Sequence, residues 1–306
     1  MLVDPTKGIS LTRCIRVGDL VVAYERHDTM KAVKVCDSLV LQNRFGVFKH
    51  LDWIGNPFGT KVFSKKGRFV YILAPTPELW TLVLSQRTQI LYIADISFVI
   101  MYLEIVPGCL VFESGTGIGS LTTSLSRAVA PTGHVCTFDF HEQRVASARE
   151  DFERVGVSHL ITVGVRVQGE GFPDEFSGRA HSVFLDLSQP WLAIPLAGKM
   201  LKPDGILCSF SPCIEQVQRS CETLRSSFTG LVEVLLSTYE VREEKINCFQ
   251  GYEGGSLVCP PCKKKQRPSE GSNVQKNLCS PVVMARPSGE DRDHTGYMTF
   301  ARLRCL

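Results

Sequence analysis

The sequence predicts an α/β protein in which a parallel sheet covered by helices follows a small domain of β-strands. Short β-type runs separated by turn residues occupy the first 75 residues. From about residue 80 to 245, runs rich in Val, Ile and Phe alternate with helical segments, as expected for strands buried on both faces. The 306 residues are 44% hydrophobic and 21% charged, which fits a large core and excludes a disordered tail, a collagen or a coiled coil.

The N-terminal domain, residues 1–75, is expected to be a small β-barrel or sandwich. Its predicted strands are residues 19–24, 31–36, 46–50, 60–64 and 68–73. The turns between them are marked by Gly46, Gly55, Asn56, Pro57 and Gly67. Pro75 and Pro77 favour extended backbone and predict the junction with a second domain, residues 76–306.

The second domain is expected to alternate buried strands and helices. Residues 90–106 predict a buried helix, because Asp95 and Glu104 interrupt the stretch and it is too short to cross a bilayer of about 30 Å. No membrane association is therefore expected. The predicted buried strands are residues 109–114, 134–140, 160–167, 181–187 and 205–212. The helices between them are residues 120–130, 141–155, 190–201 and 213–228, and the final strands are 231–241 and 296–304.

Residues 244–293 are rich in Gly, Pro, Ser and Lys and are expected to form a long, mostly disordered insertion. The basic run at 263–267 is either a nuclear-import or nucleic-acid signal or only a solvated segment. Cys259 and Cys262 have metal-like spacing but no second pair, so no metal site is expected. The twelve cysteines are scattered, and the N-terminus lacks a signal-peptide pattern, which predicts a reducing, intracellular compartment.

The net charge of +3 hides an uneven distribution. Residues 1–80 carry 12 Lys+Arg and 7 Asp+Glu, and residues 251–306 carry 9 and 5, whereas the middle carries 13 and 19. Basic ends around an acidic centre suit an anionic polymer bound across the molecule, although solvated surface lysines give the same pattern.

A glycine turn between a predicted strand and a helix marks a nucleotide-type site. Gly115, Gly117 and Gly119 are expected to let the backbone approach a ligand, and Asp139 to accept hydrogen bonds from its ribose hydroxyls. The GxGxG spacing and the preceding Glu113 favour a cationic, phosphate-free ligand such as S-adenosylmethionine over a dinucleotide. A dinucleotide oxidoreductase is thus disfavoured, and the alternative for Glu113 is a carboxylate that caps local backbone N–H groups.

Asp186 ends the fourth predicted buried strand, beside the crevice where ligands of such sheets bind. Methyl transfer from a sulfonium depends mostly on alignment of the nucleophile. If that nucleophile is a ring nitrogen of adenine, a carboxylate can accept a hydrogen bond from the exocyclic amine and stabilise the cation that forms. We assign this role to Asp186; the alternative is an aspartate that caps the next helix.

Several motifs together resemble the catalytic subunit of the eukaryotic tRNA adenine N1-methyltransferase. They are APTPELWTL, QRTQILYIADI, ESGTGIGS, APTGHV, FHEQR, VFLD followed by PW, FSPCIEQVQR and HTGYMTF. The resemblance implies a class I S-adenosylmethionine-dependent methyltransferase (Rossmann-like) domain that modifies adenine 58 in the tRNA T-loop. It also implies a nuclear location, and a related non-catalytic subunit with which two catalytic chains form a heterotetramer.

The glycine turn and the resemblance together give expected roles for individual residues. The expected cofactor-binding residues are Leu91, Glu113, Ser114, Gly115, Thr116, Gly117, Gly119, Asp139, Arg144 and Asp186. The expected substrate-binding residues are Gln89, Ile90, Tyr92, Ser209, Phe210, Ser211, Pro212, Glu215, Gln216, His294 and Thr295. Tyr92 is a wall for the flipped adenine or, alternatively, a buried tyrosine that closes the core.

One position departs from the family pattern. Arg166 stands where the family carries an acidic residue that contacts the cofactor's adenine amine, and Glu170 is the nearest replacement. This departure motivates a second hypothesis, a catalytically degenerate RNA-binding subunit that stabilises a methyltransferase complex.

Overall fold

The structure is a computed structural model that describes residues 13–26, 29–84, 90–165, 172–235, 239–244, 282–287 and 296–304. The contacts divide the chain into two compact units. One comprises residues 1–236 and 292–306, and the other residues 237–291. Each unit is described by itself.

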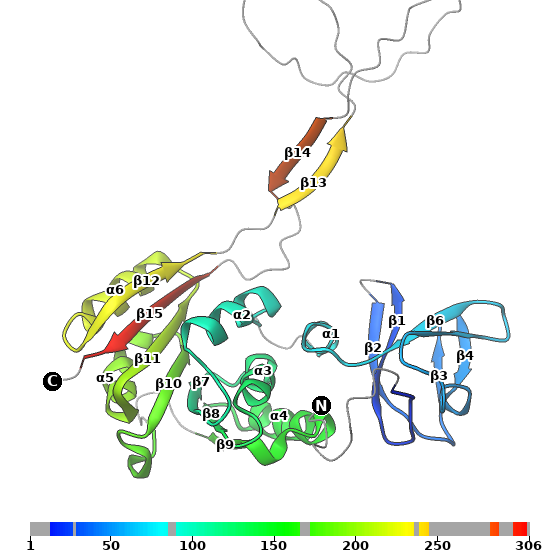
Figure 1. The fold of residues 1–306 in the computed structure, drawn as a ribbon, viewed down its shortest axis with the longest axis horizontal. Coiled ribbons are helices and arrows are strands. Elements are labelled where there is room, and N and C mark those ends of the chain that lie inside the picture. Colours follow the sequence, from blue (N-terminus) through cyan, green and yellow to red (C-terminus); the bar gives the residue numbers. More distant parts are fainter. Residues whose placement is uncertain are drawn as a thin grey trace, which may run out of the picture. The chain divides into compact units, whose positions relative to one another are not determined.

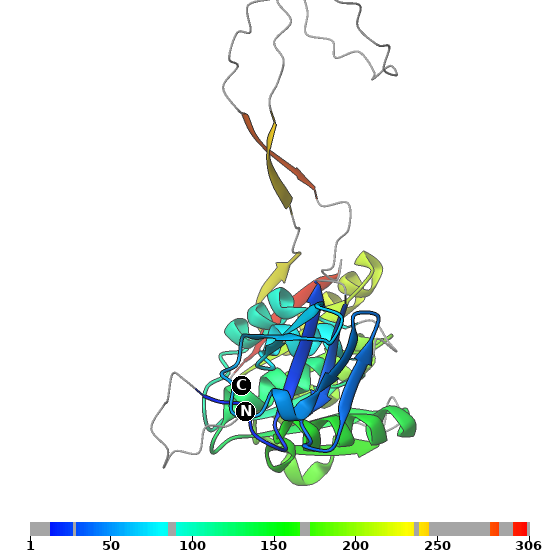
Figure 2. The ribbon, with the colours of Figure 1, turned by 90° about the vertical axis from the view of Figure 1, so that its right-hand side faces the viewer.

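The N-terminal β domain is confirmed, and its strands are divided between two sheets (Figures 1 and 2). Its elements are β1 (Leu20–Arg26), β2 (Thr29–Lys34), β3 (Val40–Asn43), β4 (Gly46–Lys49), the 3₁₀ turn η1 (His50–Asp52), β5 (Thr60–Phe63) and β6 (Phe69–Leu73). An antiparallel sheet has the order β2-β1-β6-β5, while β3 and β4 form a hairpin. Trp53, Phe48 and Ile72 are fully buried in a core that both sheets share. The short strand β3 was not predicted, because exposed Leu39 and Val40 give it no inward-facing alternation.

The larger sheet has seven strands in the order β12-β15-β11-β10-β7-β8-β9. Its strands are β7 (Leu110–Ser114), β8 (His134–Asp139), β9 (Ile161–Val165), β10 (Ala180–Asp186), β11 (Leu201–Ser211), β12 (Phe228–Val234) and β15 (Tyr297–Leu303). Strands β7 to β11 are parallel, as predicted, whereas β15 runs antiparallel to both of its neighbours, β11 and the edge strand β12. Strand β7 is the middle one of the five parallel strands, so the glycine turn that follows it lies between β10 and β8.

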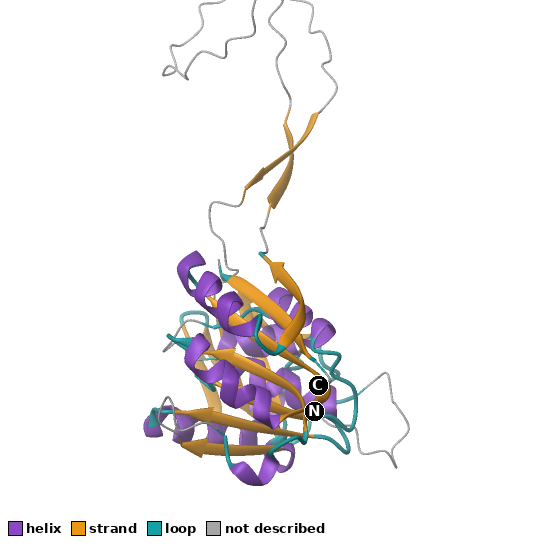
Figure 3. Ribbon diagram, turned by 90° about the vertical axis from the view of Figure 1, so that its left-hand side faces the viewer, coloured by secondary structure: helices purple, strands orange, loops and turns teal. Residues whose placement is uncertain are grey.

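Helices cover both faces of this sheet, which explains the continuous apolar character of its strands (Figure 3). The helices are α1 (Pro77–Val83), α2 (Ile93–Tyr102), α3 (Ser120–Val129), α4 (Glu142–Val155), α5 (Pro190–Met200) and α6 (Ile214–Leu224), with the short turns η2 (Ser158–Leu160) and η3 (Asp174–Phe176). Leu125 of α3 and Ile96 of α2 pack on one face, and Ile194 of α5 and Leu224 of α6 pack on the other. The described cysteines are free, and Cys109, Cys136 and Cys208 are buried. No described helix combines the length and apolar character needed to cross a membrane.

The second unit contains a pair of strands where a mostly disordered insertion was predicted. Strand β13 (Tyr239–Glu244) pairs antiparallel with β14 (Val282–Pro287), so the predicted strand 231–241 is two strands and β14 lies inside the stretch expected to be disordered. The polar composition of the whole stretch concealed the short apolar run Val282 to Met284. The basic run 263–267, Cys259 and Cys262 lie outside the described residues.

Candidate functional site

The candidate site lies where the parallel strands β7, β8, β10 and β11 end. Glu113 and Ser114 end β7, Asp139 ends β8, and Asp186 ends β10. Phe210 lies next to Asp186 in the ladder between β10 and β11. Because parallel strands have their carboxyl ends at one edge, residues far apart in the sequence converge here.

The glycine turn takes the left-handed backbone conformation at Gly115, Gly117 and Gly119, with φ of +106°, +54° and +77°. A Cβ on Gly115 would lie 2.3 Å from the carbonyl oxygen of Asp186, and one on Gly119 would lie 2.5 Å from Cε1 of Phe152. Packing thus gives a reason for glycine at these two positions that was not predicted, and the close approach of a ligand to the turn stays a prediction. Gly115 and Gly119 are needed because the turn packs against β10 and α4.

Asp139 holds this turn in place. Its carboxylate accepts the N–H of Gly117 at 3.0 Å and the N–H of His141 at 2.9 Å, and Arg144 forms an ion pair with it at 3.6 Å. Asp139 is buried, so these bonds compensate for the loss of water around the charge. Arg144 therefore lies beside the predicted ribose-binding carboxylate, and the ribose contact itself stays a prediction.

Glu113 is a buried carboxylate in a group of hydroxyls. Thr122 Oγ1 donates a hydrogen bond to it at 2.5 Å, and Thr116 and Thr137 are hydrogen-bonded to each other at 2.6 Å. Burial raises the pKa of Glu113 to about 7, against the lowering effect of hydrogen bonds from Thr122 and Thr137. Its described partners are side-chain hydroxyls, so the backbone-capping alternative is wrong.

The side chain of Asp186 lines a pocket on one side, and protein surrounds its carboxylate on the others. Two causes raise the pKa of Asp186 to about 6: burial by the surrounding protein, which is the larger, and repulsion from Asp139. The first residue before α5 is Gln189, and no side chain caps that helix. The helix-capping alternative for Asp186 is therefore wrong.

Two neighbouring pockets meet at Asp186. The larger, about 240 Å³, is lined by Ile90, Leu91, Asp186, Leu187, Ser188, Phe210, Pro212 and Gln216. The smaller, about 30 Å³, is lined by Ile90, Leu91, Glu113, Gly115, Thr116, Gly117, Ile118, Ser120, Leu121, Phe184 and Asp186. Since Ile90, Leu91 and Asp186 line both, the predicted cofactor turn and several predicted substrate residues belong to one continuous region.

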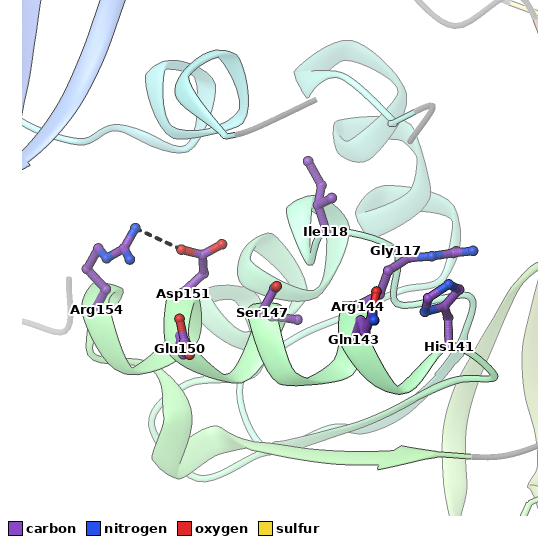
Figure 4. A pocket seen from close by; sticks show the side chains of 10 residues that line it. Gly117, Ile118, His141, Gln143, Arg144, Ser147, Glu150, Asp151 and Arg154 are labelled. Carbon is purple, nitrogen blue, oxygen red and sulfur yellow. Dashed lines mark ion pairs between the residues drawn. The ribbon is translucent and has the colours of Figure 1, made fainter. Parts of the chain in front are cut away.

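A third pocket of about 420 Å³ lies along α4, beside the glycine turn (Figure 4). Arg144, His141 and Ser147 line it from α4 or its start, and Ile118 lines it from the turn before α3. At its far end Arg154 forms an ion pair with Asp151 at 3.0 Å. His141, Ser147 and Ile118 were not predicted as site residues, because neither their type nor their spacing follows a known ligand pattern.

The structure brings together part of the predicted substrate-binding set. Ile90, Phe210, Pro212 and Gln216 line the pocket at Asp186. Gln216 is held in place, because its side-chain nitrogen donates to the Ser188 carbonyl oxygen at 2.9 Å and its oxygen accepts the Cys213 N–H at 3.3 Å.

Other predicted substrate residues do not line the described pockets. Ser209 and Ser211 are fully buried, and strand alternation places their side chains on the face of β11 opposite to Phe210. Glu215 is exposed on α6, and Tyr92 is half-buried at the start of α2. Five residues discussed above lie outside the described residues: Gln89, His294, Thr295, Arg166 and Glu170.

A hydroxyl pair that the sequence did not reveal supports the pocket wall. The Oγ atoms of Thr81 in α1 and Ser120 in α3 are 3.2 Å apart, and Ser120 donates to the Leu91 carbonyl oxygen at 3.2 Å. Both hydroxyls are buried. They fix Leu91 beside the glycine turn, a contact between residues too distant in the chain to be found from a local pattern.

The chemistry of the site fits a cationic ligand. Glu113, Asp139 and Asp186 interact electrostatically, and the pKa values of Glu113 and Asp186 are raised above those of free carboxyl groups. A bound positive charge lowers such pKa values and relieves the repulsion, whereas a diphosphate adds negative charge. The residues present therefore fit the sulfonium and amino groups of S-adenosylmethionine.

Curated relatives match most of the chain. It is 39% identical to the tRNA (adenine(58)-N(1))-methyltransferase catalytic subunit of Dictyostelium discoideum, over 95% of this chain and 97% of that one. The Candida albicans protein of the same description is 39% identical, with 94% and 96% covered. A Cryptococcus neoformans protein is 43% identical over 74% of this chain, which spans 54% of that relative's length.

Solved structures show the same fold. A SAM-dependent O-methyltransferase from Thermotoga maritima has a TM-score of 0.72 at 23% identity, covering 95% of both chains. The tRNA (m1A58) methyltransferase TrmI from Aquifex aeolicus has a TM-score of 0.68 at 21% identity, covering 96% of this chain and 100% of that one. The class I methyltransferase fold with an N-terminal β domain is thus confirmed. Residues 68–303 match the family described as tRNA methyltransferase complex GCD14 subunit, and the chain belongs to that family.

Proposed function

We propose that this chain is the catalytic subunit of a tRNA methyltransferase that transfers a methyl group from S-adenosylmethionine to N1 of adenine 58 in the T-loop. One observation carries this proposal: Asp186 lies where the pocket of the glycine turn meets the larger pocket lined by Phe210 and Gln216. Within the described residues, no group donates a hydrogen bond to its carboxylate. Asp186 is therefore available to a substrate.

The residues around the glycine turn hold the cofactor. Asp139 accepts hydrogen bonds from the ribose hydroxyls through its remaining lone pairs, and the ion pair with Arg144 keeps its carboxylate oriented. Glu113 and Asp186 supply negative charge for the cationic groups. When bound, S-adenosylmethionine supplies an activated methyl group on a sulfonium. The chain's own task is to bring a nucleophile in line with that methyl group.

Asp186 positions and activates the adenine. Its carboxylate accepts a hydrogen bond from the exocyclic amine, which raises the electron density of the ring and orients N1. N1 would use its lone pair to form the bond to the methyl carbon while the bond from that carbon to sulfur breaks; the electron pair of the broken bond would stay on the sulfur, and the positive charge would pass to the adenine ring. A carboxylate beside this ring stabilises the developing positive charge, and the apolar side chains of Ile90, Leu91 and Phe210 exclude water around it.

The adenine reaches this pocket only when it leaves its stacked position, so the tRNA elbow opens and the base is extruded. The chain works with a related non-catalytic subunit in a heterotetramer of two catalytic and two non-catalytic chains, located in the nucleus. The basic residues of its two ends support a polyanionic substrate.

The test is mass spectrometry of nucleosides from transcript tRNA incubated with methyl donor and this chain, with and without its partner. N1-methyladenine is expected with the partner and not in the Asp186→Ala complex, whereas Asp174→Ala, an exposed aspartate in η3, serves as the matched control.

The competing hypothesis, a degenerate RNA-binding subunit, predicts a different result. It requires that the wild-type complex bind tRNA but form no product and bind no S-adenosylmethionine in calorimetry. That combination would overturn the proposed function.

A further inference from the structure

One face of the four-stranded sheet in the β domain carries, on β5, β6 and the end of β1, a cluster of aromatic and basic side chains. We name this cluster the aromatic face, and it consists of Tyr24, Lys61, Phe63, Phe69 and Tyr71. Phe63 and Phe69 are 59% and 39% exposed, which is unusual for two neighbouring phenylalanines. Such an exposed group is a candidate binding surface.

The strand register brings these residues together. Tyr24 on β1 pairs with Tyr71 on β6, and Tyr71 pairs in turn with Lys61 on β5. Phe63 pairs with Phe69 in the same ladder. Because alternate residues of a strand share a face, all five side chains lie on one side of the sheet. Val62, Val70 and Ile72, which alternate with them, are buried in the core on the other side.

The rings form a continuous surface. The ring centroids of Phe63 and Phe69 are 5.9 Å apart, those of Phe69 and Tyr71 5.6 Å, and those of Tyr71 and Tyr24 6.5 Å. The ammonium of Lys61 lies 4.2 Å from the Phe69 centroid and 5.4 Å from that of Tyr71. A cation is thus placed within the ring cluster and not only at its border.

The segment that contains β5 and β6 carries charges of one sign only. Residues 53–77 contain no Asp or Glu, but they contain Lys61, Lys65, Lys66 and Arg68, all exposed. Lys65 and Lys66 lie in the tight turn that joins β5 to β6, where the N–H of Gly67 donates to the Ser64 carbonyl oxygen at 2.9 Å. The turn therefore projects positive charge beside the exposed phenylalanines.

From this arrangement we infer that the aromatic face binds unpaired nucleotides of the RNA substrate, with bases stacked on Phe63 and Phe69 and phosphates near the lysines. Aromatic rings and cations on the open face of a sheet are the combination that binds single-stranded nucleic acid. Lysine is depleted from the cores of protein interfaces, so Lys61 among the rings favours RNA over a protein partner. The inference rests on the proposed function, since it takes RNA as the substrate.

The test uses the complete complex and a double variant, Phe63→Leu with Phe69→Leu. Leucine keeps an apolar surface but has no ring on which a base stacks. We expect the Kd for tRNA to rise about tenfold, while kcat at saturating tRNA and the affinity for methyl donor stay unchanged. A second double variant, Phe63→Trp with Phe69→Trp, keeps aromatic rings and is expected to bind tRNA with the wild-type Kd. The matched control is Val47→Ala with Leu51→Ala, which are exposed apolar residues of the same domain.

A second measurement tests the charge. Lys61→Gln is expected to lower the slope of log Kd against log salt concentration by about one, as for a lost phosphate contact.

A tRNA Kd within twofold of wild type for the double leucine variant would overturn the inference. So would loss of the partner subunit on size exclusion with intact RNA binding, because the face would then be a protein contact. The tRNA Kd, its salt dependence and the size-exclusion profile measure binding without turnover, so these three readouts are independent of whether the wild-type complex forms N1-methyladenine.

Discussion

At the scale of single residues, the site is governed by carboxylates in a crowded environment. Asp186 has a pKa of about 6 because protein surrounds it and Asp139 repels its charge. Glu113 has a pKa of about 7 because it is buried. The two side chains differ in access: Glu113 is hydrogen-bonded to Thr122 inside the protein, whereas Asp186 faces the pocket. This difference assigns Asp186 to the substrate and Glu113 to the support of the turn.

The raised pKa of Asp186 predicts how methyl transfer depends on pH. Only the ionised carboxylate stabilises the adenine cation, so the rate at low pH is expected to rise about tenfold per pH unit and to level off at or below about pH 6, since the bound cationic donor lowers the pKa of Asp186. Single-turnover rates between pH 4.5 and 8.5 in the complex measure this profile. An Asp186→Asn complex is expected to show a low rate without this rise, and an unchanged profile would contradict the assignment.

The raised pKa of Glu113 predicts a change in stability. The folded protein holds this proton more tightly than the unfolded chain, so stability falls as pH rises from about 4.5 to about 7 and is constant above. The loss is about 3 kcal/mol. Glu113→Gln is expected to abolish it, so in urea titrations without ligand the variant gains stability relative to wild type between pH 5 and pH 8. Glu150→Gln, an exposed control on α4, is expected to follow wild type; a similar gain there would refute the burial argument.

At the scale of elements, the glycine turn is fixed by packing between α4, β10 and the start of α3. Gly119 has a φ of +77° and meets the ring of Phe152 on α4, which is 1% exposed. Gly156 provides an internal comparison, since its φ is +79° but nothing lies within 4 Å of its Cβ position. Substitutions at the two positions therefore separate the cost of backbone strain, which both share, from the cost of steric overlap, which only Gly119 has.

We predict that Gly119→Ala is clearly more destabilising than Gly156→Ala. The left-handed conformation costs an alanine about 1–2 kcal/mol at either position. Overlap with Phe152 adds about 1–3 kcal/mol at Gly119 only. Chemical denaturation gives the two values, and Phe152→Leu combined with Gly119→Ala is expected to recover part of the difference. Equal losses at the two glycines would show that the packing against α4 is not what requires Gly119.

At the scale of the whole molecule, every described residue of the candidate site belongs to the unit of residues 1–236 and 292–306. The hairpin of β13 and β14 belongs to the other unit, and its last described pair is Glu244 with Val282. Residues 245–281 can therefore be replaced by a two-residue Asn-Gly turn without breaking the hairpin ladder.

This replacement is predicted to leave the affinity for S-adenosylmethionine and the thermal unfolding temperature unchanged. Isothermal calorimetry and a thermal melt, each compared with the full chain, measure the two quantities. A tenfold loss of cofactor affinity would show that the replaced residues contribute to the site.

Much of this organisation could be predicted from the sequence, because buried parallel strands, a glycine turn and acidic residues at strand ends are local patterns. What a local pattern does not contain is the partner of each side chain. Gly115 was predicted for the approach of a ligand, whereas the requirement that the structure adds is packing, since a Cβ there would lie 2.3 Å from the Asp186 carbonyl oxygen. Likewise, Ser209 and Ser211 alternate with Phe210 in the strand and were expected beside it, although alternation buries them on the opposite face.

The central claim is that the Asp186 carboxylate acts directly on the adenine. Its most direct test is the single-turnover methylation rate of the Asp186→Asn complex at pH 8, with tRNA and methyl donor both saturating. Asparagine keeps the size of the side chain but removes the charge, so we expect a loss of about a hundredfold or more in rate with unchanged tRNA affinity. A rate within threefold of wild type would contradict the account and show that the geometry of the pocket alone suffices for the transfer.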